Sequence, residues 1–383
     1  MYALIPSTIY TSQQTLTHSA LLIEDDRILD LIPTATLPTD CPLVELAGQS
    51  IAPGFIDLQL NGCGGVMFND TITAATLDTM HRTNLRSGTT SFLPTLITTR
   101  DADMVAAIEV VDTYRQSHSS AVLGLHLEGP YLNPKRKGIH AERYVRPLDG
   151  AMLDWLLVHA DTVKLLTLAP EMVSLEAIHQ LSEAGILVSA GHSDASYEQA
   201  IAGFDAGVRM VTHLFNAMSP WQGRNPGLVG ATLQRSDVYA GIIADGHHVH
   251  FASIQLAQRI KQDKLILVSD ATPPAGTQME SFWIGGQEVF YRDGKCVSAE
   301  GRLGGSALTL IEAIANCVQQ IGIPLDEALR MASTYPAAAL QREGVGAIAP
   351  NSIANLVIFN SQLQVTGVVD RGQYQSCFAP VLV

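Results

Sequence analysis

Short apolar runs alternate with amphipathic stretches through the middle of the chain. Eight runs rich in Val, Ile and Leu predict buried strands, because a strand that is covered on both faces is apolar along its whole length. The stretches between them have apolar positions at helical spacing and predict crossover helices, for example at 101–118, 173–184 and 196–206. The predicted strands lie near residues 55–60, 89–95, 121–127, 163–169, 186–190, 208–213, 239–244 and 265–269.

Eight strand–helix units within about 290 residues fit a closed TIM-like (β/α)8 barrel, which takes roughly 250 residues before insertions. A doubly wound open sheet is the alternative, but the Gly-rich dinucleotide fingerprint does not follow the first predicted strand. The sequence therefore favours an α/β barrel over residues 53–344. A hairpin insertion near 276–303, with its turn at Asp293 and Gly294, interrupts the last unit and serves either as a lid or as packing.

The two chain ends carry shorter alternating segments that Pro, Thr and Asp interrupt. Residues 19–29 predict a hairpin with its turn at Asp25 and Asp26, and strands are also expected within 354–359 and 364–370. Neither end is long enough to bury a core alone. We therefore expect residues 1–52 and 345–383 to combine into one small β-sandwich domain beside the barrel.

The composition of the chain excludes several classes of protein. The chain has 383 residues, a formal net charge of −14, 47% hydrophobic residues and only 16% charged residues. This excludes a disordered tail or a coiled coil, and the acidic balance argues against nucleic acid or an anionic membrane as a partner. No apolar run of about 18 residues predicts a transmembrane helix, and the N-terminus lacks the pattern of a signal peptide.

The cysteines indicate a reducing compartment. They are odd in number, widely spaced and never in a CxxC pair, so reduced thiols in a cytoplasmic enzyme are expected. They are Cys41, Cys63, Cys296, Cys317 and Cys377.

Four predicted strands end on a residue that can hold a metal or move a proton: Glu128, His192, His213 and Asp270. A single residue of this kind is more typical of a turn, a helix N-cap or a hydrogen-bonded structural side chain. In a parallel barrel, however, the C-terminal strand ends meet at one mouth, so all four side chains are expected to lie together. The combination predicts metal-assisted hydrolysis.

Six motifs, one for each of six strand ends, resemble the amidohydrolase superfamily. The similarity extends over nearly the whole chain, and the motifs closely resemble those of the N-acetylglucosamine-6-phosphate deacetylase branch of this superfamily. Each motif alone is weak, but their order along the chain is specific. They are PGFIDLQLNGCGG at 53–65, HLEGP at 126–130, GHSD at 191–194, THLFNAM at 212–218, ADGHHV at 244–249 and VSDAT at 268–272.

The resemblance implies one divalent metal ion per subunit, held by Glu128, His192 and His213. Many relatives carry His-x-His at the end of the first strand, where this chain has Gln59 and Asn61, and a bridging lysine is also missing. The binuclear site is therefore expected to be incomplete. Two imidazoles, a carboxylate and water suit Zn²⁺, and Fe²⁺ is the alternative.

The implied reaction is removal of the acetyl group from N-acetyl-D-glucosamine 6-phosphate, an amino-sugar phosphate. Asp270 is expected to accept the proton of the attacking water and to deliver it to the leaving amine. His248 is expected to donate a hydrogen bond to the carbonyl oxygen. The galactosamine epimer is the alternative substrate. A non-catalytic binding protein is a further alternative, although the intact set of polar residues argues against it.

The resemblance also implies substrate contacts. Arg224 suits the phosphate, and we expect it to cross into the neighbour's pocket in a homodimer with a shared active site. Gly304, Gly305 and Ser306 precede a helical stretch, so their backbone N–H groups are expected to face the ligand. The full expected set is Gln59, Asn61, Ile139, His140, Asn216, Ala217, Arg224, His248, Gly304, Gly305 and Ser306.

Overall fold

Eight parallel strands form one sheet in the computed structural model, which describes residues 1–376. Each strand pairs with the next one in the chain. The sheet closes where Leu60 pairs in parallel with Ala271 and where the backbone N–H of Asp270 donates to the carbonyl of Gln59 at 2.9 Å. The predicted barrel is therefore confirmed. Its strands are β6 (Phe55–Leu60), β9 (Thr89–Ile97), β10 (Leu125–Glu128), β11 (Val163–Leu168), β12 (Leu187–Ala190), β13 (Met210–Val211), β14 (Tyr239–Ile242) and β15 (Leu265–Leu267).

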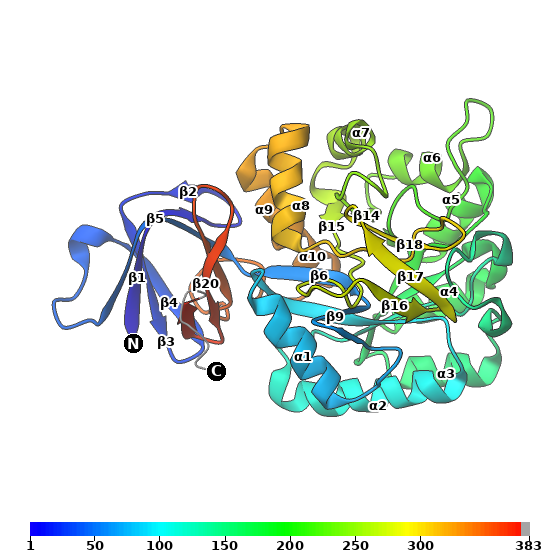
Figure 1. The fold of residues 1–383 in the computed structure, drawn as a ribbon, viewed down its shortest axis with the longest axis horizontal. Coiled ribbons are helices and arrows are strands. Elements are labelled where there is room, and N and C mark those ends of the chain that lie inside the picture. The colour runs from blue at the N-terminus through cyan, green and yellow to red at the C-terminus, as the bar shows by residue number, and fades with distance from the viewer. Residues whose placement is uncertain (377–383) are drawn as a thin grey trace.

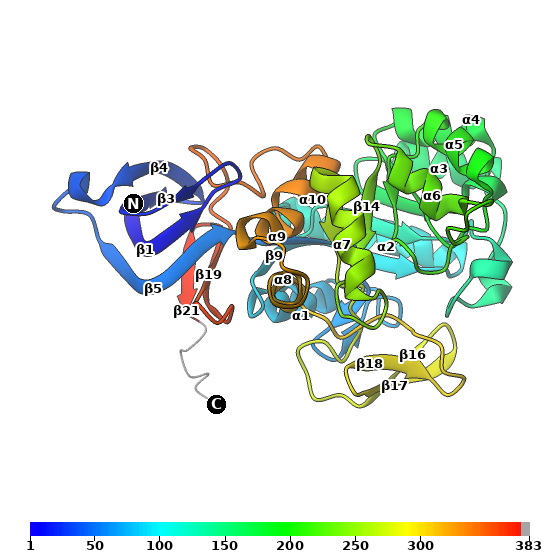
Figure 2. The ribbon, with the colours of Figure 1, turned by 90° about the horizontal axis from the view of Figure 1, so that it is seen from above.

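Helices surround the barrel (Figures 1 and 2). The three crossover helices named from the sequence are confirmed as α2 (Asp101–His118), α4 (Leu175–Glu183) and α5 (Tyr197–Ala206). Over residues 1–376, none of the helices combines the length and apolarity that crossing a membrane requires. The others are α1 (Ala74–Leu85), α3 (Gly150–Val158), α6 (Gly227–Gln234), α7 (Phe251–Lys261), α8 (Leu310–Asn316), α9 (Leu325–Ala332) and α10 (Thr334–Ala339).

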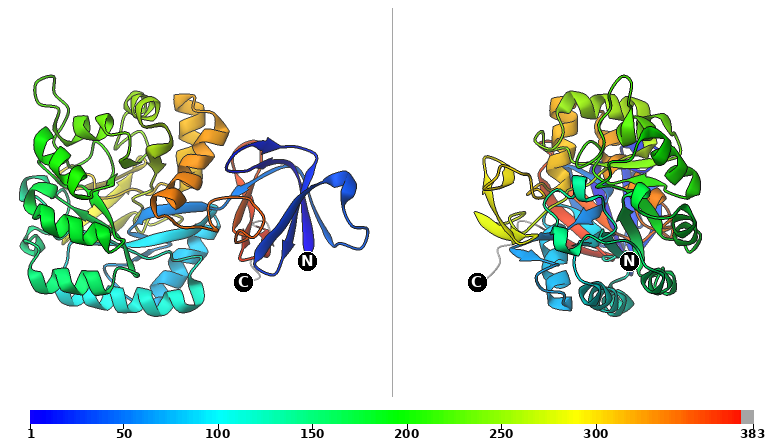
Figure 3. Two further views of the ribbon diagram at one scale, coloured as in Figure 1. Left: turned by 180° about the vertical axis from the view of Figure 1, so that it is seen from behind. Right: turned by 90° about the vertical axis from the view of Figure 1, so that its right-hand side faces the viewer.

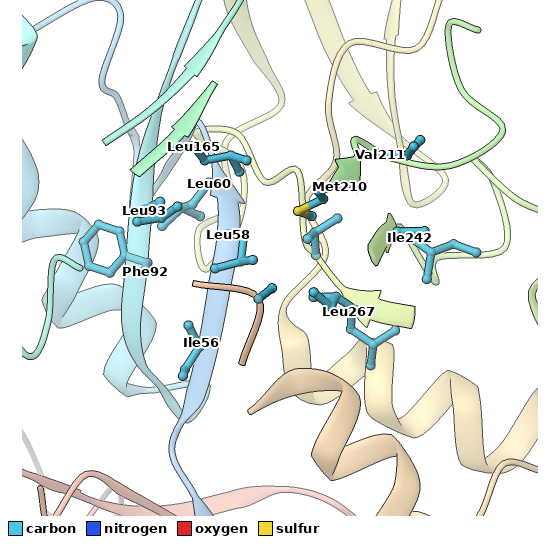
Figure 4. Close-up of a cluster of buried hydrophobic side chains, with 14 of the residues drawn as sticks. Ile56, Leu58, Leu60, Phe92, Leu93, Leu165, Met210, Val211, Ile242 and Leu267 are labelled. Atoms are coloured by element: carbon cyan, nitrogen blue, oxygen red, sulfur yellow. The ribbon is translucent and has the colours of Figure 1, made fainter. Parts of the chain in front are cut away.

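The barrel strands bury side chains on both of their faces, which explains why most of them are largely apolar without a regular alternation. Leu58, Met210 and Leu267 are 0 to 2% exposed and belong to one cluster in Figure 4. Burial of one such side chain stabilises the fold by roughly 1.5–3 kcal/mol. The barrel core is therefore a rigid base for the polar residues at the strand ends.

Strands from both chain ends form a second sheet in the order β21-β20-β19-β5-β1-β3-β4, with β2 paired to β1. It encloses its own apolar cluster, which includes Leu4, Ile23 and Leu356. The expected small β domain built from both ends is confirmed, and it lies beside the barrel (Figure 3). The strands are β1 (Tyr2–Tyr10), β2 (Thr15–Leu16), β3 (Ser19–Glu24), β4 (Arg27–Pro33), β5 (Leu43–Pro53), β19 (Leu356–Phe359), β20 (Val365–Asp370) and β21 (Gln373–Ser376).

The turn at Asp25 and Asp26 joins β3 to β4 as predicted, with Glu24 opposite Arg27. The domain boundaries near residues 52 and 345 stay a proposal. Residues 377–383, which include Cys377, lie outside the described residues.

The insertion contains a three-stranded antiparallel sheet of β16 (Ser281–Ile284), β17 (Gln287–Arg292) and β18 (Lys295–Ser298). The predicted hairpin is β17 and β18, and its turn at Asp293 and Gly294 has the positive φ values, +51° and +77°, of a tight hairpin turn. Figure 2 shows the sheet projecting from one side of the barrel. Phe282, Ile284 and Val289 pack it against a short hairpin, β7 (Gly62–Cys63) and β8 (Val66–Met67), and against Ile97 and Ile139.

Candidate active site and metal centre

Glu128, His192 and His213 meet at the barrel mouth and are named here the Glu–His–His cluster. Glu128 ends β10, and the two histidines each lie two residues beyond β12 and β13. Oε1 of Glu128 is 3.0 Å from Nε2 of His192 and 3.0 Å from Nε2 of His213, and the two nitrogens are 3.1 Å apart. All three residues are at most 5% exposed. The structure therefore brings the three expected metal ligands together.

The hydrogen bonds of the cluster suit metal binding. Nδ1 of His192 lies 2.8 Å from the carbonyl oxygen of Arg136. A carbonyl only accepts, so Nδ1 carries a proton, and Nε2 is the ring nitrogen that faces Glu128 and could bind a metal. Nδ1 of His213 is buried with no partner. Ligands at 2.0–2.1 Å from a tetrahedral ion are roughly 3.3 Å apart, close to the distances found here.

Glu128 is ionised in this environment. Burial by itself raises the pKa of a carboxyl group, but hydrogen bonds from His192 and His213 outweigh it and hold the pKa of Glu128 well below its usual range. One anionic oxygen and two imidazole nitrogens are the donor set of many zinc sites.

His140 lies beside the cluster. One of its ring nitrogens is within 4.8 Å of ligand atoms of Glu128 and His192. Its Nδ1 is 2.8 Å from Oγ1 of Thr98, whose hydroxyl donates to the carbonyl of Glu128. Burial, with a contribution from His192, lowers the pKa of His140 to about 3. A neutral His140 can therefore contact a ligand at the cluster or serve as an additional metal ligand.

Asp270 lies next to the cluster. Its Oδ1 accepts hydrogen bonds from Nδ2 of Asn61 at 2.7 Å and from Nε2 of Gln59 at 3.2 Å. The same Gln59 nitrogen is 3.2 Å from Oε1 of Glu128, so it links the two carboxylates. Burial, and then the charge of Glu128, raises the pKa of Asp270 to about 6. A carboxylate with a pKa near neutrality is suited to both accepting and returning a proton.

A cavity of about 370 Å³, named here the mouth cavity, opens above these groups. Asp270, His248 and the Glu–His–His cluster line it. Other expected contacts also line it: Asn61, Ile139, His140, Asn216, Ala217 and Gly305. Gln59 lies behind it and reaches it only through Asp270 and Glu128.

Besides Gln59, three expected substrate contacts do not line the cavity: Arg224, Gly304 and Ser306. Arg224 is exposed in the loop before α6 and does not line it. The backbone N–H groups of Gly304 and Ser306 donate to the carbonyls of Cys296 and Asp270, so they are not available to a ligand. The expected helix begins at Leu310, four residues after Ser306, so Gly304, Gly305 and Ser306 do not belong to its first turn.

Three basic residues of the cavity were not predicted: Lys135, Arg136 and Arg302. Lys135 and Arg136 belong to a run of three basic residues just before Gly138, a signal that the sequence did contain. Arg136 is paired with Asp194 at 2.8 Å, and Arg302 with Glu300 at 3.3 Å. These side chains give the cavity rim positive charge in a protein that is acidic as a whole.

Comparisons with known proteins show the family to which the chain is similar. Residues 50–374 match the amidohydrolase family, and residues 1–51 match the NagA composite domain. The chain is 42% identical to an N-acetylglucosamine-6-phosphate deacetylase of Haemophilus influenzae, over 98% of this chain and 99% of that protein. It is 35% identical to an N-acetylgalactosamine-6-phosphate deacetylase of Shewanella sp. (strain ANA-3), over 93% and 91%.

Solved structures show the same fold over nearly the whole chain. The crystal structure of an N-acetylglucosamine-6-phosphate deacetylase from Pasteurella multocida superposes with a TM-score of 0.96 at 44% identity, covering 98% of this chain and 99% of that one. A mutant of the Mycobacterium smegmatis deacetylase in complex with N-acetyl-D-glucosamine-6-phosphate superposes with a TM-score of 0.91 at 29% identity, covering 97% and 98%.

Proposed function

The chain belongs to the amidohydrolase family, and from this premise we propose that it is a metal-dependent deacetylase. Its reaction converts N-acetyl-D-glucosamine 6-phosphate and water into D-glucosamine 6-phosphate and acetate. The observation that carries the proposal is the Glu–His–His cluster with Asp270 beside it in one cavity. The similarity to deacetylases over nearly the full length of both chains supports the choice of substrate class.

The metal proposal rests on the donor set. Glu128, His192 and His213 would hold one divalent ion, and the contact of His192 Nδ1 with the carbonyl of Arg136, which leaves Nε2 for the ion, supports this assignment. Zn²⁺ is the proposed ion, with Fe²⁺ as the alternative. When bound, such an ion polarises a carbonyl group and lowers the pKa of water. His140 is the residue that would extend the ligand set, because it also lies within reach.

Asp270 is proposed to move the proton. The water oxygen bonds to the acetyl carbon, and Asp270 takes the proton that this water loses. Asp270 then delivers the same proton to the sugar nitrogen as the C–N bond breaks, so the amine leaves neutral. Asn61 and Gln59 hold Oδ1 of Asp270 in place, which fixes the direction of the carboxylate throughout.

The remaining cavity residues are proposed to hold the substrate. His248 donates to the carbonyl oxygen as its negative charge develops. Ile139, His140, Asn216, Ala217 and Gly305 contact the sugar or its phosphate, and the positive rim attracts the phosphate.

Arg224 supports a homodimer with a shared active site. The side chain is exposed and does not line the cavity of its own subunit. Trp221 on the same loop is 58% exposed, so the loop offers apolar surface next to the guanidinium. The proposal is that this loop enters a partner subunit's cavity and that Arg224 binds phosphate there.

We also propose that the enzyme acts in the cytoplasm. Cys41, Cys63, Cys296 and Cys317 are free and buried thiols, which supports a reducing compartment.

An acetate-release assay tests the function. Purified protein with added Zn²⁺ or Fe²⁺ is incubated with N-acetyl-D-glucosamine 6-phosphate, with its galactosamine epimer and with both unphosphorylated sugars. We expect the highest kcat/KM for the glucosamine phosphate and little release from the free sugars. The higher identity to the glucosamine enzyme, 42% against 35%, supports this order. Absence of acetate from either phosphate with either metal would overturn the proposal.

A further inference from the structure

The carboxylate of Glu171 joins two segments of the barrel mouth, and the scheme above gives it no role. Glu171 is partly buried in the short turn η4 (Pro170–Met172) that follows β11. Its Oε1 accepts the side-chain amide of Asn133 at 2.8 Å and the backbone N–H of Asp194 at 2.7 Å. Its Oε2 accepts the hydroxyl of Ser193 at 2.7 Å. Asn133 belongs to residues 129–140, named here the β10 segment, and the other two partners belong to residues 191–196, the β12 segment.

Both of these segments hold the metal ligand His192. The β12 segment contains His192 itself. From the β10 segment, the N–H of Asn133 donates to the carbonyl of His192 at 2.9 Å, and the carbonyl oxygen of Arg136 lies 2.8 Å from its Nδ1. A Cβ at Gly138 would lie 3.4 Å from Cε1 of the His192 ring, so the backbone of the β10 segment packs against the imidazole. The direction of Nε2 therefore depends on how the two segments are held against each other.

The backbone of His192 needs such support, because its φ of +50° is unfavourable for a residue with a Cβ. The two residues that follow it, Ser193 and Asp194, are the ones that Glu171 contacts. Asp194 also accepts a hydrogen bond from Nε of Arg136 at 2.8 Å, so the two segments are joined a second time beside this contact. Glu171 is thus placed where it can keep the strained ligand in one orientation.

We propose that Glu171 is a positioning residue of the metal centre. By holding the β10 and β12 segments together, it directs Nε2 of His192 toward Glu128 and thereby sets the affinity for the metal ion. Glu171 does not line the mouth cavity, so it acts through His192 and not by contact with the ion or the substrate. The inference rests on the proposed metal site, but it does not depend on which sugar phosphate is the substrate.

Glu171→Ala removes all three hydrogen bonds. Groups that orient a ligating histidine typically change metal affinity 10- to 100-fold when they are lost. We therefore expect the Kd for Zn²⁺, measured by competition with a chromophoric chelator, to rise roughly 10- to 100-fold. Glu176→Ala is the matched control, because Glu176 is exposed on α4 and its side chain accepts only from Gln180. This variant should bind Zn²⁺ as the wild type does.

Glu171→Gln is the conservative variant that should restore the affinity. Its amide oxygen can take the place of Oε1 and accept from Asn133 and Asp194, and its amide nitrogen can donate to the hydroxyl oxygen of Ser193. All three links then survive without the negative charge. We expect a Kd for Zn²⁺ close to that of the wild type. A Kd raised as much as in Glu171→Ala would overturn the proposal, since the charge and not the positioning would then matter.

Thermal unfolding of the metal-free proteins separates positioning from a general loss of stability. A lower Tm in Glu171→Ala with an unchanged Kd for Zn²⁺ would show a purely structural residue and overturn the proposal. If Glu171→Ala does not fold, Asn133→Ala removes one of the three links and leaves the carboxylate in place. We expect a smaller rise in the Kd from this variant, and an unchanged Kd would overturn the proposal.

The same measurements distinguish this inference from the proposed function. A wild type that binds no Zn²⁺ would overturn both the proposed metal site and the role of Glu171. Equal Zn²⁺ affinity in Glu171→Ala and in a wild type that releases acetate would overturn the role of Glu171 alone.

Discussion

His192, His213 and Asp270 all stand on backbone that side chains rarely adopt. Their φ values are +50°, +31° and +51°. For residues other than glycine this region costs roughly 1–2 kcal/mol each. Hydrogen bonds from adjacent segments of the same chain hold this conformation. For example, the N–H of Asn133 donates to the carbonyl of His192 at 2.9 Å. The strained backbone thus lowers the stability of the fold at the positions where the direction of a side chain matters, as is common at functional sites.

The first prediction concerns Asp270. In Asp270→Asn, the side-chain oxygen can still accept a hydrogen bond from Asn61 or Gln59, but the amide cannot take a proton. We expect kcat to fall by roughly 10²- to 10⁴-fold while the metal content, measured by elemental analysis, stays at the wild-type value. Asn216→Ala is a useful comparison, because a substrate contact should affect KM as well. Wild-type turnover in metal-loaded Asp270→Asn would contradict the assignment.

The second prediction concerns Asp57, which is buried in β6. Its Oδ1 accepts the N–H groups of Gln59 at 3.1 Å and Ser269 at 3.2 Å, and burial raises its pKa from 3.8 to about 7. Between these values the folded protein keeps a proton that the unfolded chain has lost. The free energy of unfolding therefore decreases as pH rises, by about 1.4 kcal/mol per pH unit from this group.

Asp57→Asn retains the accepting oxygen and cannot ionise. Its free energy of unfolding, relative to that of the wild type, should therefore increase from pH 5 to pH 7 and level off above. Urea unfolding of both proteins at pH 5, 6, 7 and 8 measures this difference. A difference that stays constant over the series would show that Asp57 does not titrate in this window.

At the scale of elements, the barrel strands were predictable because most are rich in apolar residues, and four of them lead into Glu128, His192, His213 or Asp270. We expected a helical stretch directly after Ser306, but α8 begins at Leu310. The capping pair Thr309 and Glu312, in which the N–H of Thr309 donates to Glu312 at 2.9 Å, places the start at Leu310 and was the missed signal. Arg302 could not be predicted, because only the folded insertion brings it to the cavity.

The insertion gives the third prediction. Gly285 and Gly286 form the turn between β16 and β17, with φ values of +58° and +81°. A Cβ at Gly285 would lie 2.0 Å from the carbonyl oxygen of Ile139, whereas one at Gly286 meets nothing within 4 Å. Both substitutions to Ala carry the cost of positive φ, but only the first displaces the segment that bears Ile139 and His140.

We therefore expect Gly285→Ala to lower kcat/KM by roughly 10- to 100-fold, because small displacements in a site have large effects on rate. Gly286→Ala is the matched control and should remain close to wild type in kcat/KM. Equal losses in the two variants would mean that the turn does not position the cavity wall.

The fourth prediction belongs to the whole molecule. If Arg224 serves the partner's cavity, a subunit with Arg224→Ala and a subunit with Asp270→Asn complement each other. In their mixed dimer, the Arg224→Ala subunit keeps Asp270 and receives Arg224 from its partner. Random mixing of equal amounts should then restore about a quarter of wild-type activity. Activity no higher than the mean of the two separate variants would argue that Arg224 acts within its own subunit or not at all.

The central claim is that one divalent ion is held by Glu128, His192 and His213, with Asp270 across the substrate from it. A crystal structure of Zn²⁺-loaded Asp270→Asn protein with N-acetyl-D-glucosamine 6-phosphate, with anomalous data at the zinc edge, tests this most directly. We expect a single zinc peak among those three side chains and the acetyl group between the zinc and position 270. A zinc peak elsewhere, or an acetyl group out of reach of position 270, would contradict the account.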